Sequence, residues 1–434
     1  MKIAIIGSGI SGLTAAWYLQ QQHEVTLFES AERLGGHTAT VDVTVPSGQY
    51  AVDTGFIVFN DRTYPNFERL LGELGIERQP TEMSFSVKNE ATGLEYNGHT
   101  LSTMFAQRKN LLRPSFYYLL FEIVRFNRLA KRALQDDEAL DGTLGDFLQH
   151  HQFSAPFVTN YILPMGAAIW SSTLCDMRAF PLRFFMRFFI NHGLLDVTNR
   201  PQWYVIPGGS REYIRRMEQQ WSVDVKLNAS ITAVSRSPQR VDIDYQQESQ
   251  VVRSSFDQVI FACHSDQALR LLSDASAAEQ QVLGAIPYQE NEVVLHTDSR
   301  LLPNTKAAWA SWNYLLRAGS NQDTAPTALT YNMSKLQGLS ADETFCVTLN
   351  QTEMISEEKI LASFNYSHPV FNLESVEAQQ QRGRINGQDG TWFCGAYWYN
   401  GFHEDGVRSA LDVVHGIRQQ PMLVDVDSQH EMTA

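Results

Sequence analysis

The chain begins with a short apolar run that passes directly into a set of spaced glycines. Residues 2–6 read KIAII, and Gly7, Gly9 and Gly12 follow in the pattern GxGxxG. A helix-forming stretch comes next, and then a second apolar run, 24–28. A buried strand, a helix and another buried strand within about thirty residues form a βαβ unit, whose right-handed crossover makes the two strands parallel. This feature predicts an α/β fold with a glycine-rich turn between the first strand and its helix.

Each glycine of this turn has its own physical role. Gly7 allows the tight turn out of the strand, Gly9 lets the backbone approach a pyrophosphate, and Gly12 lets the helix pack closely on the strand. The first helical turn, which holds Ser11, presents backbone N–H groups to the phosphates. Glu29 ends the second strand, where its carboxylate accepts hydrogen bonds from the hydroxyls of an adenosine ribose. The pattern predicts a dinucleotide site, with a purely structural glycine turn as the alternative.

Composition narrows the classes of protein that such a turn could serve. The chain has 34 Lys and Arg against 48 Asp and Glu, and its net charge of −14 argues against a nucleic-acid partner. Its four cysteines form no CxxC pair, so we expect no metal site and reduced thiols. No apolar window is long enough to span a bilayer, and the first apolar run is broken too early for a secretory signal. We expect a cytoplasmic protein, with peripheral contact at the inner face of the membrane left open and the oligomeric state unknown.

The residues after Glu29 indicate which dinucleotide the site binds, namely a flavin. Arg33, Gly35 and Gly36 form an RxGG motif. It resembles that of the GG-doublet flavoprotein superfamily, which includes amine oxidases, protoporphyrinogen oxidases and phytoene desaturase-like enzymes. The resemblance implies a Rossmann-like FAD-binding domain of the glutathione-reductase type, with these three residues and His37 along the FAD diphosphate.

Three further segments resemble motifs of the same superfamily. VDTG resembles the segment beside the ribityl chain and the flavin, and the strand after PGG resembles the segment that packs on adenine. WFCG and GFHEDGV resemble the last motif, whose helix N-terminus faces the isoalloxazine and stabilises reduced, anionic flavin. The FAD contacts implied by these segments are Asp53, Thr54, Gly55, Ile231, Gly395, Glu404, Asp405, Gly406 and Val407.

Long stretches such as DTGFIVFNDRTYPNF and AAWASWNY are similar to a bacterial group of NAD/FAD-binding, amine-oxidase-like proteins. Members of that group look like companions of cyclopropane-fatty-acid-synthase-like methyltransferases, which implies acyl-chain chemistry by association. The resemblances imply noncovalent FAD and hydride transfer from a substrate carbon to flavin N5. The expected enzyme is a dehydrogenase, desaturase or oxidase of a hydrophobic small molecule or acyl lipid. A flavin-containing amine oxidase and a non-redox lipid- or prenyl-binding protein are the alternatives.

Two residues are candidates for catalysis. Many amine oxidases hold a lysine near flavin N5, which implies that role for Lys306, with a surface lysine as the alternative. His403 falls near the expected flavin and has an ordinary pKa close to neutral, so it is a candidate proton acceptor, with a structural hydrogen bond as the alternative. Tyr397, Tyr399 and Phe402 resemble the aromatic wall that some amine oxidases have beside the flavin, with packing under the ring as the alternative. Together with Trp312 they are the expected substrate pocket.

Flavin motifs at both ends mean that the chain leaves one domain and later returns to it. We expect an FAD-binding domain from 1–80, 205–285 and 386–418, an interleaved α+β substrate-binding domain from 81–204 and 286–385, and a tail from 419–434. Two stretches of the substrate part stay open to two interpretations. The Phe-rich stretch 180–195 is either core or a tunnel or membrane contact, and the basic, apolar stretch 108–132 is either a solvated helix with a core stripe or a membrane-facing helix.

Overall fold

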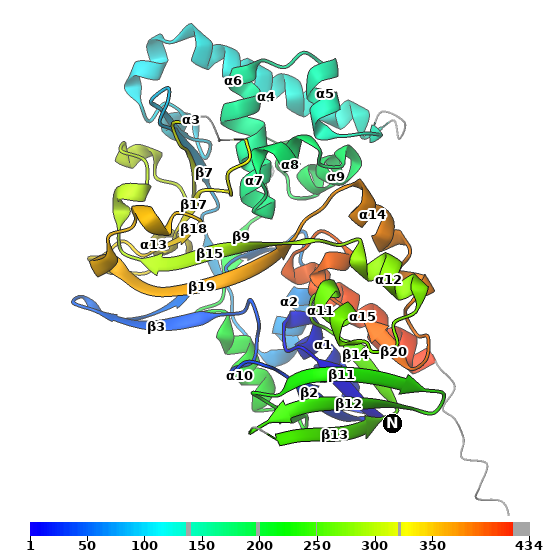
Figure 1. The fold of residues 1–434 in the computed structure, drawn as a ribbon. Coiled ribbons are helices and arrows are strands. Elements are labelled where there is room, and N and C mark those ends of the chain that lie inside the picture. Colours follow the sequence, from blue (N-terminus) through cyan, green and yellow to red (C-terminus); the bar gives the residue numbers. More distant parts are fainter. Residues whose placement is uncertain (136–139, 197–199, 249, 320–322, 420–434) are drawn as a thin grey trace, which may run out of the picture.

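The molecule consists of a parallel-sheet part and a larger part of mixed sheet and helices (Figure 1). The structure is a computed structural model, and it describes residues 1–135, 140–196, 200–248, 250–319 and 323–419. The expected tail lies outside the described residues except for Gln419, which ends the last helix. Among the described residues, no helix is both long enough and apolar enough to cross a bilayer.

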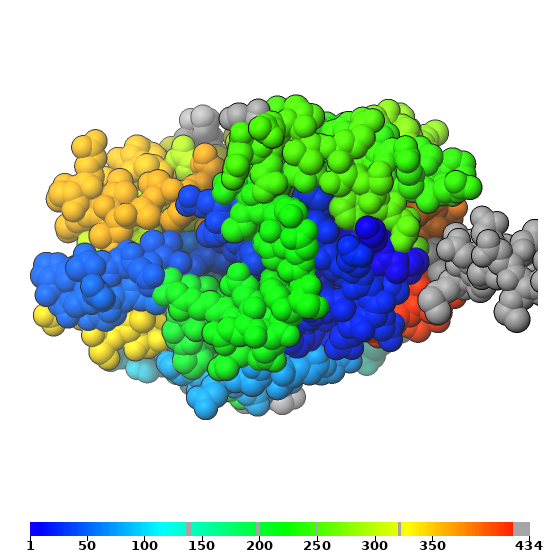
Figure 2. Space-filling model, turned by 90° about the horizontal axis from the view of Figure 1, so that it is seen from below, coloured from blue at the N-terminus to red at the C-terminus, as the bar shows by residue number. Residues whose placement is uncertain are grey.

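A five-stranded parallel sheet carries the glycine-rich turn. Its strands, in spatial order, are β10 (Asp224–Lys226), β2 (Glu24–Phe28), β1 (Lys2–Ile6), β14 (Gln258–Phe261) and β20 (Thr391–Phe393). All four neighbouring pairs are parallel, which confirms the α/β class and the parallel pairing expected for the first two strands. Figure 2 shows the N-terminal segment in blue against the middle segment in green on this side of the molecule.

The sheet is the middle of three layers. Ile3 and Ile5 point to one face and Ala4 and Ile6 to the other, because side chains alternate along a strand. The first face is covered by helices and the second by an antiparallel three-stranded sheet. These elements are α1 (Ile10–Leu19), α2 (Pro65–Leu74), α10 (Arg211–Glu218) and α15 (His403–Gln419), and β11 (Ser230–Ser237), β12 (Arg240–Gln247) and β13 (Gln250–Phe256). Strands β10 and β11, although close in sequence, belong to different sheets.

A seven-stranded sheet forms the frame of the larger part. Its strands, in spatial order, are β19 (Ile360–Pro369), β15 (Tyr288–His296), β18 (Cys346–Leu349), β17 (Leu329–Asn332), β16 (Trp312–Leu316), β7 (Phe85–Asn89) and β8 (Leu94–Asn97). The hairpin β3 (Thr40–Val45) and β4 (Gly48–Asp53) packs its apolar side chains into the core of this sheet. The chain therefore crosses between the two parts even within its first eighty residues, and the domain boundaries remain a proposal.

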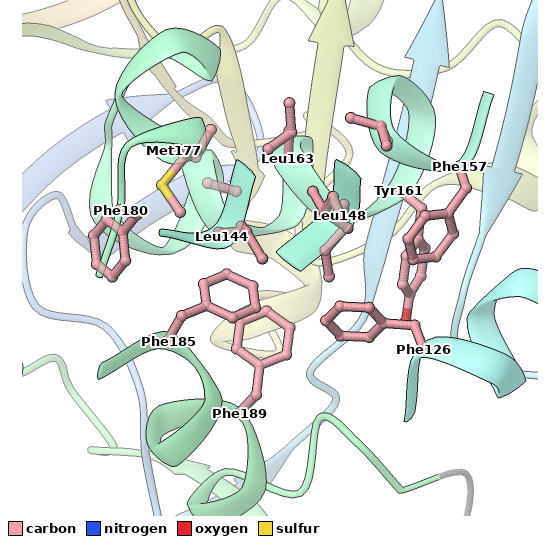
Figure 3. Packing of buried hydrophobic residues seen from close by; sticks show 14 of the residues in the cluster. Phe126, Leu144, Leu148, Phe157, Tyr161, Leu163, Met177, Phe180, Phe185 and Phe189 are labelled. Carbon is pink, nitrogen blue, oxygen red and sulfur yellow. The ribbon is translucent and has the colours of Figure 1, made fainter. Parts of the chain in front are cut away.

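Helices cover one end of this sheet and enclose an apolar core (Figure 3). They are α3 (Leu101–Met104), α4 (Pro114–Ala133), α5 (Leu144–His150), α6 (Ala155–Phe157), α7 (Leu163–Trp170), α8 (Leu174–Arg178) and α9 (Leu182–Asn191). Phe185 and Phe189 are buried and stack with ring centroids 4.0 Å apart. The Phe-rich stretch is therefore mostly core. The helix expected within the stretch 108–132 is α4, which begins at Pro114, because proline is favoured in the first turn of a helix.

Short elements connect the two parts. Strands β5 (Phe59–Asn60) and β6 (Gln79–Thr81) flank β9 (Trp203–Val205) in a small antiparallel sheet. The remaining helices are α11 (Ser265–Leu271), α12 (Ala277–Gly284), α13 (Met333–Leu336) and α14 (Leu373–Gln380).

Candidate active site

A cavity of about 1210 Å³ extends from the glycine-rich turn to the helices of the larger part. Gly9, Glu29 and Ile231 line one end, and Met165 and Phe188 line the other. This volume exceeds the roughly 300–1,000 Å³ of a typical small-molecule site, so it suits a large ligand together with a second molecule.

The three glycines of the turn meet three different surroundings. A Cβ on Gly12 would lie 1.9 Å from the carbonyl oxygen of Gly7, so α1 packs directly on the turn. Gly7 itself has a φ of +100°, which residues with side chains rarely adopt. A Cβ on Gly9 would meet no atom within 4 Å, and Gly9 lines the cavity. The geometry matches the tight turn, the close packing and the open approach that a pyrophosphate site requires.

Glu29 lies at the cavity wall where β2 ends. Its Oε2 accepts hydrogen bonds from the backbone N–H of Ser8 at 3.0 Å and from the Ser8 hydroxyl at 2.6 Å. Its Oε1 accepts from the backbone N–H of Ala31 at 2.9 Å. These bonds fix the carboxylate in place and leave acceptor positions for the hydroxyls of a ribose.

The RxGG motif contributes its glycines to the cavity, whereas its arginine supports the loop. Gly35, Gly36 and His37 line the cavity. Arg33 donates to the backbone carbonyls of Thr38 at 3.1 Å and Gly36 at 3.0 Å, and it is not among the lining residues. The structure therefore places Arg33 as a clamp on the loop rather than along the expected diphosphate.

Three histidines gather in the cavity wall. The ring centroid of His37 lies 5.3 Å from that of His368 and 6.2 Å from that of His264. Burial lowers the pKa of all three rings, that of His368 to about 4, so they are neutral at pH 7. The buried Nε2 of His37 has no hydrogen-bond partner among the described residues. This nitrogen is available to a ligand in the cavity.

Only one of the VDTG residues expected to contact FAD lines the cavity. Gly55 lines the cavity, and a Cβ there would lie 2.2 Å from the carbonyl oxygen of His37. Asp53 does not line it and instead accepts from the hydroxyl of Thr40 at 2.6 Å and the backbone N–H of Ser210 at 2.9 Å. Burial raises the pKa of Asp53 to about 6. Thr54, also outside the lining, shares a 2.9 Å hydrogen bond with the hydroxyl of the cavity residue Tyr366.

In the C-terminal motif, Gly395 lines the cavity, whereas Glu404 and Asp405 do not. Glu404 accepts from the backbone N–H of Phe67 at 2.9 Å, in the first turn of α2, and so caps that helix. Asp405 accepts from the backbone N–H of Phe402 at 2.9 Å, and burial raises its pKa to about 7. Neither carboxylate lines the large cavity.

The other two residues expected from this motif are packing residues. A Cβ on Gly406 would lie 2.6 Å from the side chain of Ile10, so α15 crosses α1 closely at this point. Val407 is fully buried in the core between the helices and the parallel sheet. Ser11 and Ile231 do line the cavity, as expected for residues beside phosphate and adenine.

His403 lies at the cavity wall but is held by its own neighbours. Its ring stacks on Phe56 with centroids 3.5 Å apart, and its Nε2 lies 3.1 Å from the hydroxyl of Thr38 and 3.2 Å from that of Tyr213. Burial lowers its pKa to about 3. A ring that is neutral and already hydrogen-bonded fits the structural alternative better than a proton acceptor with a pKa near neutral.

Lys306 is not brought to the cavity. It is exposed in a short 3-10 turn, and its Nζ lies 5.8 Å from the ring centroid of Trp309. It is not among the lining residues. The structure therefore agrees with the alternative interpretation, in which Lys306 is a surface lysine.

Three of the four expected aromatic pocket residues line the cavity. Trp312, Tyr397 and Phe402 do so, whereas Tyr399 points to Asp412, to which its hydroxyl donates at 2.6 Å. The buried Nε1 of Trp312 and the hydroxyl of Tyr397 have no partner among the described residues.

Sequence reasoning missed two of the three clustered histidines, His264 and His368. His264 follows the carboxyl end of β14, and ligands of parallel sheets bind at such ends. Its place after a predicted strand could therefore have indicated a residue of the site. His368 lies on β19 in the other sheet, and no local pattern connects it with the glycine-rich turn. Only the tertiary structure places these two residues in one wall.

Comparison with known proteins identifies the family to which the chain belongs. The model of the family "flavin containing amine oxidoreductase" matches residues 10–415. The chain belongs to this family. A protein of Mycobacterium tuberculosis named as a flavin-containing monoamine oxidase, AofH, is 27% identical over 254 residues, which cover 54% of this chain and 52% of that protein. The chain thus spans about half the length of the curated relative it matches.

Solved structures of other proteins share the fold of this chain. A fatty acid isomerase from P. acnes that produces CLA has a TM-score of 0.67 and 14% identity, covering 95% of this chain and 98% of its own. A putrescine oxidase with bound putrescine has a TM-score of 0.66 and 14% identity, covering 97% of this chain and all of its own. At this identity the likeness shows the fold alone.

FAD is the cofactor that family membership implies, and the cavity fits it. The open space at Gly9, the fixed carboxylate of Glu29 and the unpartnered nitrogen of His37 suit phosphates and a ribose. Cys263 is the cavity-lining cysteine of the described residues, and burial raises the pKa of its thiol to about 12. A neutral thiol is a poor nucleophile, which agrees with noncovalent attachment.

Proposed function

We propose that this protein is an FAD-dependent oxidoreductase that oxidises a carbon of a hydrophobic, lipid-like substrate such as a fatty-acyl chain. The apolar lining at the end of the cavity away from Glu29 supports this proposal most strongly. The side chains there are those of Met83, Phe85, Met104, Leu120, Ile123, Val124, Met165, Ile169, Trp170, Phe188, Leu194 and Phe402. Such a surface stabilises a long apolar chain by removing it from water.

The two ends of the cavity have separate tasks in this proposal. Ser11, Glu29, His37 and Ile231 are the candidates for holding FAD by its phosphates, ribose and adenine. Bound FAD supplies the acceptor for a hydride from the substrate carbon. The apolar side chains orient the substrate and exclude water, and the electrons leave to O₂ or another acceptor.

The charged lining residues favour an acyl chain over an amine. Only two carboxylates occur among the described lining residues, Glu29 and Asp196. Glu29 is held by Ser8 beside the turn, and Asp196 forms an ion pair with Lys131. Neither is free to pair with an ammonium group. Arg200 also lines the cavity and offers a cation to a carboxylate head group.

An amine oxidase remains the second candidate. The similarity to proteins named as a monoamine oxidase and a putrescine oxidase favours it, as does the aromatic ring of Tyr397 in the cavity wall. A lipid- or prenyl-binding protein without redox chemistry is the third candidate. It predicts a purified protein that is colourless and takes up no FAD.

Anaerobic bleaching of the flavin separates these candidates. The FAD-loaded protein is mixed without O₂ with fatty acids or acyl lipids in one series and with primary amines and diamines in the other. The proposal expects loss of the visible flavin absorbance with acyl compounds, and mass spectrometry then finds a product two hydrogens lighter. Bleaching by amines alone would contradict the proposal and establish the second candidate.

A further inference from the structure

Exposed apolar side chains are concentrated in one short part of the chain. Among the described residues, ten large apolar side chains are exposed, and seven of these lie between residues 101 and 124. These seven form what we call the docking face: Leu101, Leu111, Leu112, Tyr117, Tyr118, Phe121 and Val124. Leu112 is 88% exposed, Leu101 80% and Phe121 60%. A cluster of this kind marks an interaction site, whereas single exposed apolar residues need no explanation.

The helix α4 connects the docking face with the cavity. One side of this helix, including Phe116, Leu119 and Phe126, is buried in the helical core. A second side, which includes Leu120 and Ile123, lines the cavity, and the third side belongs to the docking face. In Figure 1, α4 runs along the edge of the molecule farthest from the parallel sheet.

The docking face borders the cavity at two of its residues. Leu101 and Val124 are both exposed and part of the cavity lining, so the cavity reaches the surface between them. A ligand that leaves the apolar end of the cavity here emerges among apolar side chains rather than in open water.

Charge distinguishes this region from the rest of the protein. Residues 101–128 hold five Lys or Arg and one acid, although the whole chain has a net charge of −14. The acid, Glu122, is fully buried and pairs with Arg125 at 3.6 Å. The exposed charges of the region, at Arg108, Lys109 and Arg128, are therefore positive. They complement an anionic surface that would repel the remainder of the molecule.

We propose that the docking face inserts into the head-group layer of an anionic phospholipid bilayer and opens the cavity toward the lipid. Aromatic and leucine side chains beside Lys and Arg are typical of helices that lie in the interface without spanning the membrane. The helix α4 has twenty residues, about 30 Å, but it is not apolar enough to span. The basic side chains contact anionic head groups, and the tyrosines lie at the depth where their rings are apolar and their hydroxyls are hydrated.

Vesicle sedimentation tests the proposal with the FAD-loaded protein and without any turnover. Phosphatidylcholine vesicles with and without phosphatidylglycerol are used as the two surfaces. We expect the protein to sediment with the anionic vesicles, to bind neutral vesicles much more weakly, and to be released by salt. Because binding is measured directly, failure of the proposed acyl oxidation leaves this result unaffected, and failure of vesicle binding leaves the proposed oxidation unaffected.

A matched pair of double variants tests the apolar contribution. Tyr118→Ser with Phe121→Ser, both on the docking face and outside the cavity lining, should weaken binding to anionic vesicles about tenfold or more. Val251→Ser with Leu373→Ser removes two apolar side chains elsewhere that are at least half exposed, and it should leave binding unchanged. The flavin content of each variant shows that it is folded.

A second pair tests the charge. Arg108→Gln with Lys109→Gln should weaken binding to anionic vesicles, whereas Arg216→Gln, on the exposed side of α10, should not. The proposal is overturned if the unaltered protein stays in the supernatant with anionic vesicles, or if the control variants lose as much binding as the docking-face variants. It is also overturned if light scattering shows that the docking face is covered by a second copy of the chain in solution.

Discussion

The two ends of the cavity are built by different parts of the polypeptide. At the nucleotide end, the backbone decides the shape: a Cβ on Gly12 would collide with the carbonyl oxygen of Gly7, and the space at Gly9 is open. At the apolar end, side chains from α4, α7 and α9 decide it. A backbone-built site needs particular residues at fixed spacing and so leaves a motif. A side-chain-built site needs only volume and polarity, which many sequences provide.

The largest effect expected of a substitution at neutral pH is that of Gly12→Ala at the nucleotide end. The new methyl group would lie 1.9 Å from a backbone oxygen, so α1 must move away from the turn. We expect the free energy of unfolding to fall by about 3 kcal/mol or more, measured by urea denaturation, and FAD binding to be lost with it. Unaltered stability would show that the close packing of α1 on the turn is not essential.

Ile169→Asp tests the apolar end. Ile169 lines the cavity among other apolar side chains, and an added carboxylate disfavours a hydrocarbon chain there. We expect kcat/KM for an acyl substrate to fall about a hundredfold while the Kd for FAD stays unchanged. The conservative variant Ile169→Leu should retain activity. A parallel loss of FAD affinity would mean that the two ends are not independent.

Gly9→Ala is the matched partner of Gly12→Ala. Its Cβ meets no protein atom within 4 Å but projects where a pyrophosphate would lie. We expect the free energy of unfolding to lie within about 0.5 kcal/mol of that of the unaltered protein. The Kd for FAD, measured by flavin fluorescence, should rise about tenfold or more. If both alanine variants lost the same stability, Gly12 would not differ from Gly9 in its role. Gly12 would then not be needed specifically for packing α1 on the turn, nor Gly9 specifically for the approach of the pyrophosphate.

A pH series with His403→Gln tests the buried imidazole in the cavity wall. Burial lowers the folded-state pKa of His403 to about 3, against an ordinary value of 6.5. As the pH falls below about 6.5, the unfolded chain binds a proton that the folded chain does not. Stability therefore falls by up to about 1.4 kcal/mol per pH unit until about pH 3. The variant should lack this contribution, so the difference between the two proteins shrinks on acidification. A difference independent of pH would contradict a neutral, buried His403.

Lys306→Met should have the smallest effect. The lysine is exposed and does not line the cavity. We expect kcat and KM for the best substrate to change less than about twofold, within about 0.4 kcal/mol. A large fall in kcat alone would instead support the role near flavin N5 that the resemblance to amine oxidases implies.

Much of the nucleotide end could be predicted from the sequence. The strand, turn, helix and second strand are local in sequence, and each glycine follows from a local steric requirement, so the spacing alone predicted them. The family resemblance implied FAD contacts for Arg33, Glu404 and Asp405, yet none of the three lines the cavity, because a polar side chain next to a motif can turn toward the backbone instead. Arg33 binds the carbonyls of its own loop, and Glu404 caps α2, which the sequence places more than three hundred residues earlier.

The sequence by itself determined the parallel βαβ unit and the flavin-type turn, because both depend on contacts between residues that are close along the chain. The tertiary structure alone decided which residues form the cavity wall. It brought His37, His264 and His368 together from three distant segments, and it turned one side of α4 to the core, one to the cavity and one outward. A helical pattern shows which residues are apolar. Only the packing of the other elements shows which apolar side is left uncovered.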